Sequence, residues 1–161
     1  MRIIFRTLSL AALLLWAGTA VAAVDIAGVK VDEALSVAGT RLQLNGAGVR
    51  YKGPFKVYVG DLYATRPVKS LDELIAAPGP KRLGMTFLRE INSAEFGKML
   101  TRGIEDNVSR SEVSKIIPGM IKMGDIFAAN KAFAPGDVCV LEWDPAKGLS
   151  VWVKGKLQAV R

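Results

Sequence analysis

Apolar and polar positions alternate along this chain with two different periods, one typical of strands and the other of helices. Alternation with a period of two, rich in β-branched and aromatic residues, predicts strands at residues 40–44, 55–63, 81–88, 138–143, 149–153 and 157–160. The first of these segments runs into Asn45-Gly46-Ala47-Gly48, and this turn-forming composition predicts that the strand ends there.

Three segments combine helix-capping residues with helical spacing. Ser70-Leu-Asp-Glu73 predicts a capping box at the start of a short helix that ends before Pro78. Ser93 is expected to cap a longer helix. A third helical stretch is expected from Ser111, with a break or kink at Pro118-Gly119. The apolar face of the second helix consists of Phe96, Met99, Leu100, Ile104 and Val108.

The order of these elements predicts the class of fold. Strands come first, a pair of helices follows, and a β-hairpin ends the chain, with Trp143 and Trp152 flanking its turn and expected to contact each other across the strands. This order favours an α+β fold in which helices cover one face of an antiparallel sheet. The 161 residues show no repeat and no long linker, so we expect one domain.

The N-terminal residues resemble a secretory signal. Arg2 and Arg6 precede an apolar run at residues 8–16, and Ala20-Val21-Ala22 offers a small-x-small cleavage site. We therefore expect a signal peptide at residues 1–22, a domain at 23–161, and a mature protein in the periplasm or outside the cell. An uncleaved membrane anchor is the alternative.

The composition excludes several classes of chemistry. The chain has no histidine and a single cysteine, Cys139, which rules out histidine-based triads, histidine or multi-cysteine metal sites and a disulfide within the chain. It also has no P-loop and no dinucleotide-binding glycine motif. We expect no metal and no organic cofactor. Cys139 lies in an apolar strand and is expected to be a buried, inert thiol.

The charge favours small anionic partners over nucleic acid. The formal net charge is +7, to which the predicted signal contributes two, and the remaining basic residues are scattered. Nucleic-acid binding would need a basic stripe with interleaved aromatic residues, so we expect none. Attraction of an anionic small molecule, or weak contact with anionic lipid headgroups, fits the charge better. Among the carboxylates, Asp61 is a candidate for acid–base work, but no partner for it is identifiable along the chain.

Two consecutive segments resemble a known family. Residues 44–52 contain Asn-Gly-Ala-Gly-Val-Arg, and residues 55–63 form a long strand that ends in Leu-Tyr. This pattern is similar to the chalcone isomerase superfamily, and most closely to its exported bacterial chalcone-isomerase-like branch. Residues 87–107 and the strand start at Gly136-Asp137-Val138 also fit, so the resemblance covers most of residues 36–158.

The resemblance implies an open-faced β-sandwich, in which a large antiparallel sheet carries a layer of helices with a ligand cleft between them. Plant members of the superfamily close a chalcone into a flavanone by intramolecular addition. Other branches bind fatty acids through an arginine and a tyrosine. The family continues beyond the last strand into a further helix. Because the sequence stops at Arg161, we expect either that this helix is missing or that the sequence is a fragment.

The resemblance also assigns roles to individual residues. Arg50 matches the family arginine, which attracts the anionic oxygen, and Tyr58 falls at or beside a family threonine. Phe96 occupies the position of the active-site tyrosine without its hydroxyl, and Asn107 matches the asparagine. Arg50 and Asn107 are thus the candidate catalytic residues. The candidate ligand-binding residues are Arg50, Tyr58, Phe96 and Met99.

Each of these residues also has a purely structural interpretation. Arg50 is then a surface arginine, Tyr58 a half-buried strand residue, Phe96 and Met99 core residues, and Asn107 a helix-terminal residue. Our leading hypothesis is a protein that binds a small amphipathic carboxylate or phenolate, such as a fatty acid, with Arg50 at the polar end of an apolar cleft. The alternatives are an isomerase of the intramolecular lyase type and a ligand-free envelope interaction protein. The oligomeric state is left open.

Overall fold

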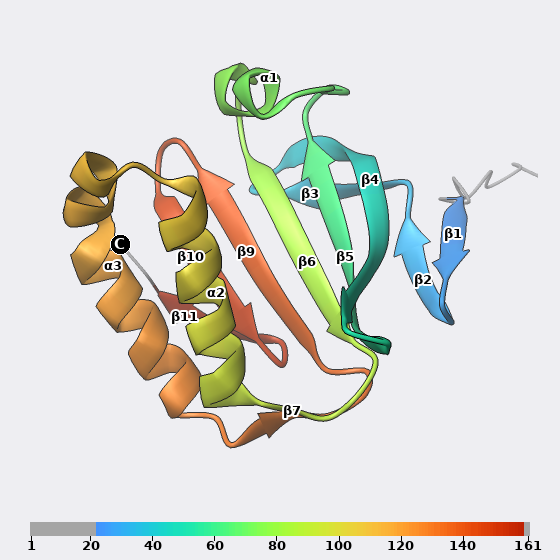
Figure 1. Ribbon diagram of the computed structural model, residues 1–161. Coiled ribbons are helices and arrows are strands. Elements are labelled where there is room, and N and C mark those ends of the chain that lie inside the picture. The colour runs from blue at the N-terminus through green and yellow to red at the C-terminus, as the bar shows by residue number, and fades with distance from the viewer. Residues whose placement is uncertain (1–21, 160–161) are drawn as a thin grey trace, which may run out of the picture.

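A seven-stranded antiparallel sheet forms the centre of the molecule. The computed structural model describes residues 22–159, so residues 1–21 of the predicted signal lie outside the described part. The strand order is β11-β10-β9-β6-β5-β4-β3 (Figure 1). The strands are β3 (Ala34–Val37), β4 (Thr40–Lys52), β5 (Phe55–Ala64), β6 (Lys81–Phe87), β9 (Val138–Asp144), β10 (Gly148–Val153) and β11 (Lys156–Ala159).

Two helices form a layer on one face of this sheet. Helices α2 (Ser93–Asn107) and α3 (Arg110–Ala128) lie over the β9–β11 end and leave β4 and β5 uncovered on this side (Figure 1). The short helix α1 (Leu71–Ala76) links β5 to β6. A small ladder of β7 (Ile91–Asn92) and β8 (Ala132–Phe133) joins the segments before α2 and after α3. The predicted α+β class and the open-faced sandwich are confirmed.

An aromatic core fills the space between the helices and the sheet. The Phe87 and Phe133 rings are stacked with their centroids 4.2 Å apart, and Phe96 meets both Phe87 and Phe127 edge-on, at 5.0 and 5.2 Å. These four rings are almost fully buried. Cys139 is also fully buried in this core, and burial raises its pKa to about 12, so the thiol stays protonated. The predicted burial of Cys139 is confirmed.

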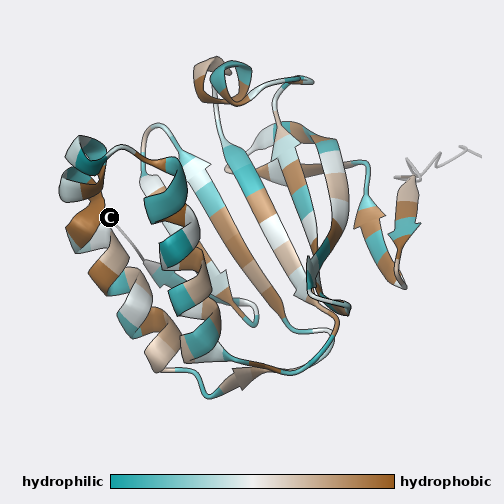
Figure 2. Cartoon of the chain, in the orientation of Figure 1, coloured by the Kyte–Doolittle hydropathy of each residue, from teal (hydrophilic) through white to brown (hydrophobic). Residues whose placement is uncertain are grey.

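A second core lies on the opposite face, beneath a hairpin of β1 (Ala23–Ile26) and β2 (Val29–Asp32). Its buried members are Val31, Val37, Leu42, Val59 and Tyr63. The Tyr63 hydroxyl donates a hydrogen bond of 2.8 Å to the Asp32 carbonyl and so ties the hairpin to β5. Figure 2 shows the resulting alternation of hydrophobic and hydrophilic residues along the strands.

The β4 strand continues through the glycine-rich segment where the sequence predicted its end. Residues 46–52 pair with β5, and an irregularity between Leu44 and Gly46 accommodates the extra residue Asn45. The Asn45 side chain accepts a hydrogen bond of 2.7 Å from the Val68 amide, which anchors the loop after β5. The prediction was wrong because the cross-strand pairing of this segment outweighs the turn preference of its glycines.

The N-caps of both long helices lie earlier than expected, by one residue for α2 and by two for α3. The N-cap of α2 is Asn92, whose side chain accepts from the Glu95 amide, and the N-cap of α3 is Ser109, which forms a capping box with Glu112. Pro118 does not break α3. Proline removes one hydrogen bond to the carbonyl four residues before it, but both Pro118 and Ser114 are exposed, so water can replace the lost partner.

Candidate functional site

Arg50 and Tyr58 lie directly opposite each other on adjacent strands. They are paired in the β4–β5 ladder, and Tyr58 is also paired with Phe87 of β6. Residues paired across strands point to the same face, and the Tyr58 ring meets Phe87 and Phe96 edge-on, at 6.1 and 6.3 Å between centroids. The pair therefore lies on the helix-bearing face, at the margin of the aromatic core.

A β-bulge brings these two residues together. The hairpin ladder begins with Lys52 opposite Phe55 and Tyr51 opposite Lys56, so a regular register would place Val57 opposite Arg50. The register shift between Arg50 and Tyr51 replaces Val57 with Tyr58 at that position. Without the bulge, Arg50 and Tyr58 would point to opposite faces of the sheet.

The surroundings of the pair leave the guanidinium available to an anion. Arg50 is exposed, and within residues 22–159 no carboxylate forms an ion pair with it. Tyr58 is half-buried; burial raises the pKa of its hydroxyl, while the positive charge of Arg50 acts in the opposite direction. The hydroxyl therefore keeps its proton and can donate a hydrogen bond beside the guanidinium.

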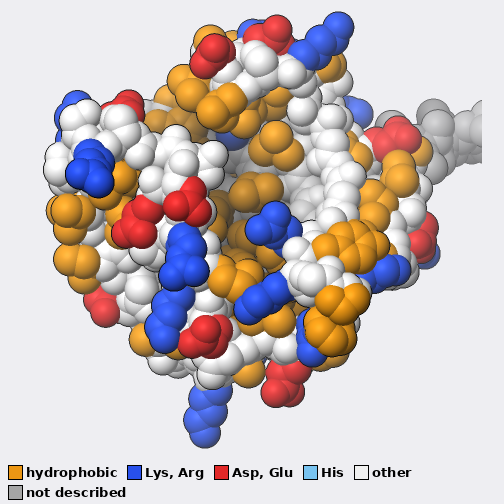
Figure 3. Space-filling view, viewed as in Figure 1, with side chains coloured by type: hydrophobic (Ala, Val, Ile, Leu, Met, Phe, Trp, Pro, Cys, Tyr) orange, Lys and Arg blue, Asp and Glu red, His pale blue; other side chains and the backbone are white. Residues whose placement is uncertain are grey.

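Glycines make the sheet surface next to this pair bare. Gly48 pairs with Gly60 one step along the helix-bearing face from Arg50 and Tyr58, and Gly46 pairs with Leu62 one step further. A Cβ atom added at Gly46 or Gly48 would meet nothing within 4 Å. Figure 3 shows a hollow between the helices and β4–β5, with hydrophobic side chains inside it and basic ones at its edge. We call this space the glycine hollow.

Phe96 and Met99 come from α2. Phe96 is only 2% exposed and belongs to the aromatic core, with its ring next to Tyr58, while Met99 is half-buried on the same helix. Leu100 packs against the same core. Phe96 therefore contributes to the core and to the surroundings of Tyr58 at once, and the position where the resemblance implies a tyrosine holds no hydroxyl.

Asn107 lies away from this group. It is exposed at the C-terminal end of α2, where its side-chain amide donates a hydrogen bond of 2.8 Å to the Gly103 carbonyl. Eleven residues separate it from Phe96, about 16 Å along a helix. The structure thus brings Arg50, Tyr58 and Phe96 together, but it does not bring Asn107 to them.

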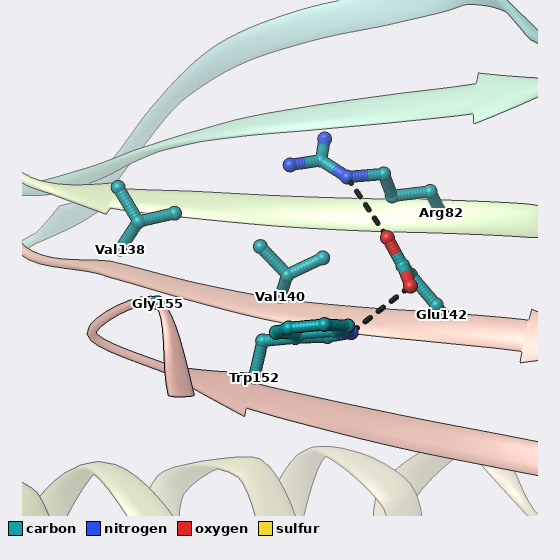
Figure 4. Close-up of a pocket in the computed structure, with 6 residues that line it drawn as sticks. All are labelled: Arg82, Val138, Val140, Glu142, Trp152 and Gly155. Atoms are coloured by element: carbon teal, nitrogen blue, oxygen red, sulfur yellow. Dashed lines mark hydrogen bonds and ion pairs between the residues drawn. The ribbon is translucent and has the colours of Figure 1, made fainter. Parts of the chain in front are cut away.

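A pocket of about 370 Å³ lies on the opposite face of the sheet (Figure 4). Its lining residues are Arg82, Val138, Val140, Glu142, Trp152 and Gly155. Trp152 is paired with Val140, and Trp143 with Leu149, so the two tryptophans belong to opposite faces. The expected contact between them is wrong, because their positions differ by one step in the alternation of the hairpin.

The charged groups at this pocket are bound to one another. Arg82 donates to the Asp61 carboxylate at 3.1 Å, and its Nε lies 3.6 Å from a Glu142 oxygen. The Trp152 indole donates to Glu142 at 3.0 Å. Burial raises the pKa of Asp61, and Arg82 opposes that rise. The partner of Asp61, which lies 21 residues away in the sequence, could be found only from the β5–β6 pairing.

Two features are absent from the described part of the chain. Between residues 22 and 159, no group of three or more Cys, Asp and Glu residues is placed to hold a metal ion. In the same range, no helix is long and apolar enough to cross a membrane.

Comparison with known proteins gives one result. A family model described as chalcone isomerase-like matches residues 23–160, nearly the whole of the described chain. No curated protein matches the sequence.

Proposed function

Because the chain belongs to the chalcone isomerase-like family, we propose that it binds a small amphipathic anion in the glycine hollow. The anion is a carboxylate or phenolate, such as a fatty acid, with its charged oxygens on Arg50. The observation that carries the proposal is the pairing of Arg50 with Tyr58 at the margin of this hollow. Membership of the exported bacterial branch, and export through residues 1–22, are further parts of the proposal.

The polar end of the site suits two oxygens on one carbon. A guanidinium can donate two parallel hydrogen bonds to a carboxylate and remains charged when it is partly desolvated. The Tyr58 hydroxyl adds a third donor next to it. Since Arg50 forms no ion pair within residues 22–159, an incoming anion does not have to displace a carboxylate of this part of the chain.

The apolar end of the site suits a hydrocarbon or an aromatic ring. Gly46 and Gly48 present bare backbone next to the Arg50–Tyr58 pair, so an extended chain can approach β4 closely. Leu62 lies on the same face of the sheet. Apolar area removed from water stabilises a complex by about 25 cal/mol per Å² before the costs of association are subtracted.

This arrangement supports binding more directly than isomerisation. Binding requires a cation, a hydrogen-bond donor and apolar surface, and these occur together at Arg50, Tyr58 and the hollow. The isomerase alternative adds Asn107 as a second catalytic residue, and this residue lies at the far end of α2. We therefore propose a carrier or binding protein as the function.

Removing the guanidinium is expected to weaken fatty-acid binding. A hydrogen bond to a charged group contributes about 1.5–3 kcal/mol, so Arg50→Ala should lower the affinity for dodecanoate about 10- to 100-fold. The affinity of Arg50→Lys should lie between those of the wild type and Arg50→Ala, because the ammonium keeps the charge but not the forked geometry. Isothermal titration calorimetry measures these affinities.

The matched control is Arg41→Ala, which removes an exposed arginine from the same strand, where it pairs with Ser36 outside the hollow. It should bind dodecanoate like the wild type. Unchanged dodecanoate affinity in Arg50→Ala would contradict the role assigned to Arg50.

Filling the glycine hollow is expected to block the ligand without unfolding the protein. The Cβ added in Gly48→Leu meets nothing within 4 Å, and the backbone there is one that any residue adopts, so the thermal midpoint should stay near that of the wild type. Dodecanoate binding should weaken at least about tenfold, because one side chain then occupies the ligand's volume. The control is Gly124→Leu, at an exposed glycine of α3 with equally open surroundings. Full binding by Gly48→Leu would place the ligand elsewhere.

A further inference from the structure

The tip of the β4–β5 hairpin exposes two large aromatic side chains. Tyr51 is 51% exposed and Phe55 is 57% exposed, on either side of the turn at Gly53 and Pro54. Exposed aromatic residues scattered singly are common on protein surfaces, but these two stand at the end of one projecting hairpin. Together they offer a partner two apolar rings at one site.

The tip is amphipathic on both of its sides. Lys52 is paired with Phe55, and Tyr51 is paired with Lys56. Paired residues share a face, so each face of the hairpin carries one lysine and one aromatic ring. A protein partner that docks against one face would use only half of this surface. A medium that surrounds the tip would use all of it.

The charge of the tip has a single sign. Residues 50–56 contain Arg50, Lys52 and Lys56 and no carboxylate. Arg89, from the segment after β6, adds a fourth positive charge, with its guanidinium carbon 4.7 Å from the centre of the Phe55 ring. Figure 3 shows hydrophobic and basic side chains gathered at the end of β4–β5.

The exposed apolar groups of α1 and α3 lack this combination. Leu71 and Ile75 on α1 are even more exposed, at 66% and 69%, but Asp72 and Glu73 stand between them. The exposed isoleucines of α3 have both lysines and carboxylates as neighbours on their helix. Compared with these two helices, the hairpin segment 50–56 joins apolar rings to positive charge with no carboxylate of its own.

We propose that this tip, residues 50–56 with Arg89, docks onto an anionic phospholipid bilayer. Aromatic rings favour the boundary between headgroups and acyl chains, and lysine and arginine are attracted to anionic headgroups. Arg50 stands two residues from Lys52, about 7 Å along the strand, so docking brings the polar end of the glycine hollow to the headgroup layer. The docking surface is defined by the tip itself and does not require that the hollow binds a ligand.

Hydrogen exchange measured by mass spectrometry tests this on the full chain. Vesicles of phosphatidylcholine are compared with vesicles of phosphatidylcholine and phosphatidylglycerol, with no fatty acid present. Exchange is measured at the hairpin itself. Co-sedimentation with vesicles would not test the tip, because the apolar run at residues 8–16 can bind lipid on its own. We expect anionic vesicles to slow exchange in residues 51–56, neutral vesicles to leave it unchanged, and high salt to reverse the effect.

Three double variants complete the test. Tyr51→Ser/Phe55→Ser and Lys52→Gln/Lys56→Gln should each raise the lipid concentration needed for half-maximal protection about tenfold or more. The matched control, Leu71→Ser/Ile75→Ser, should leave it unchanged. The proposal is overturned if anionic vesicles leave the tip unprotected, if neutral vesicles protect it equally, or if the α1 control loses protection as the tip variants do. Dodecanoate is also titrated into the tip variants without vesicles. Unchanged dodecanoate affinity shows that the ligand site is intact, so a loss of docking is distinguished from a failure of the ligand site.

Discussion

Gly84→Ala is expected to lower the free energy of unfolding by about 3 kcal/mol or more. A Cβ at Gly84 would overlap both carboxylate oxygens of Asp61, a residue that is only 8% exposed. The carboxylate would have to leave Arg82, its partner at 3.1 Å. Separating a largely buried ion pair costs several kcal/mol because the Asp61 carboxylate loses its partner without regaining full hydration, while Arg82 keeps only its longer contact of 3.6 Å with Glu142.

Urea denaturation of Gly84→Ala measures this effect. The matched control is Gly48→Ala on β4, where the added methyl group meets nothing within 4 Å, and its stability should lie within about 0.5 kcal/mol of the wild type. A loss of about 3 kcal/mol corresponds to a fall of roughly 6–12 °C in the thermal midpoint for a chain of this size. Equal stabilities of the two alanine variants would mean that the Asp61–Arg82 pair does not depend on the bare backbone of Gly84.

Phe96→Ala is expected to be similarly damaging, at about 3–5 kcal/mol. The ring is 2% exposed and meets Phe87, Phe127, Phe133 and Tyr58. Its removal leaves a cavity where both helices join the sheet, and it also removes the ring that supports Tyr58. Ligand affinity should therefore fall together with stability.

Exposed Phe55 provides the control for Phe96. Its contact with Arg89 is a cation–π interaction worth about 0.5–1 kcal/mol, so Phe55→Ala should cost no more than about 1 kcal/mol. Both variants are compared by urea denaturation at equal pH and salt. If Phe96→Ala costs no more than Phe55→Ala, the aromatic core does not hold α2 to the sheet.

The sequence predicts most of the strands because their alternation reports which face is buried. Strand β6 ends within a residue of its expected end, and β9 and β10 are each within a residue of theirs. The sequence pattern did not predict the first three strands, β1, β2 and β3. They are four residues each, and their stability comes from partners elsewhere, as when Tyr63 ties the β1–β2 hairpin through Asp32.

The site shows where sequence patterns stop being informative. Alternation places Tyr58 on the opposite face from Val57 and Val59, but it cannot say which β4 residue lies opposite Tyr58. That depends on the bulge next to Arg50, a property of the paired strands. The glycine hollow was also missed, since a glycine pattern that resembles a turn in the sequence is bare strand surface in the folded sheet.

The central claim, that Arg50 recognises the charged head of a ligand in the glycine hollow, is tested most directly by a two-by-two comparison. Dodecanoate and its uncharged methyl ester are titrated into the wild type and Arg50→Ala by calorimetry. The account predicts that the wild type prefers the acid by about tenfold or more and that Arg50→Ala loses this preference while keeping its affinity for the ester. A preference for the acid that survives in Arg50→Ala, or an equal loss for acid and ester, would contradict it.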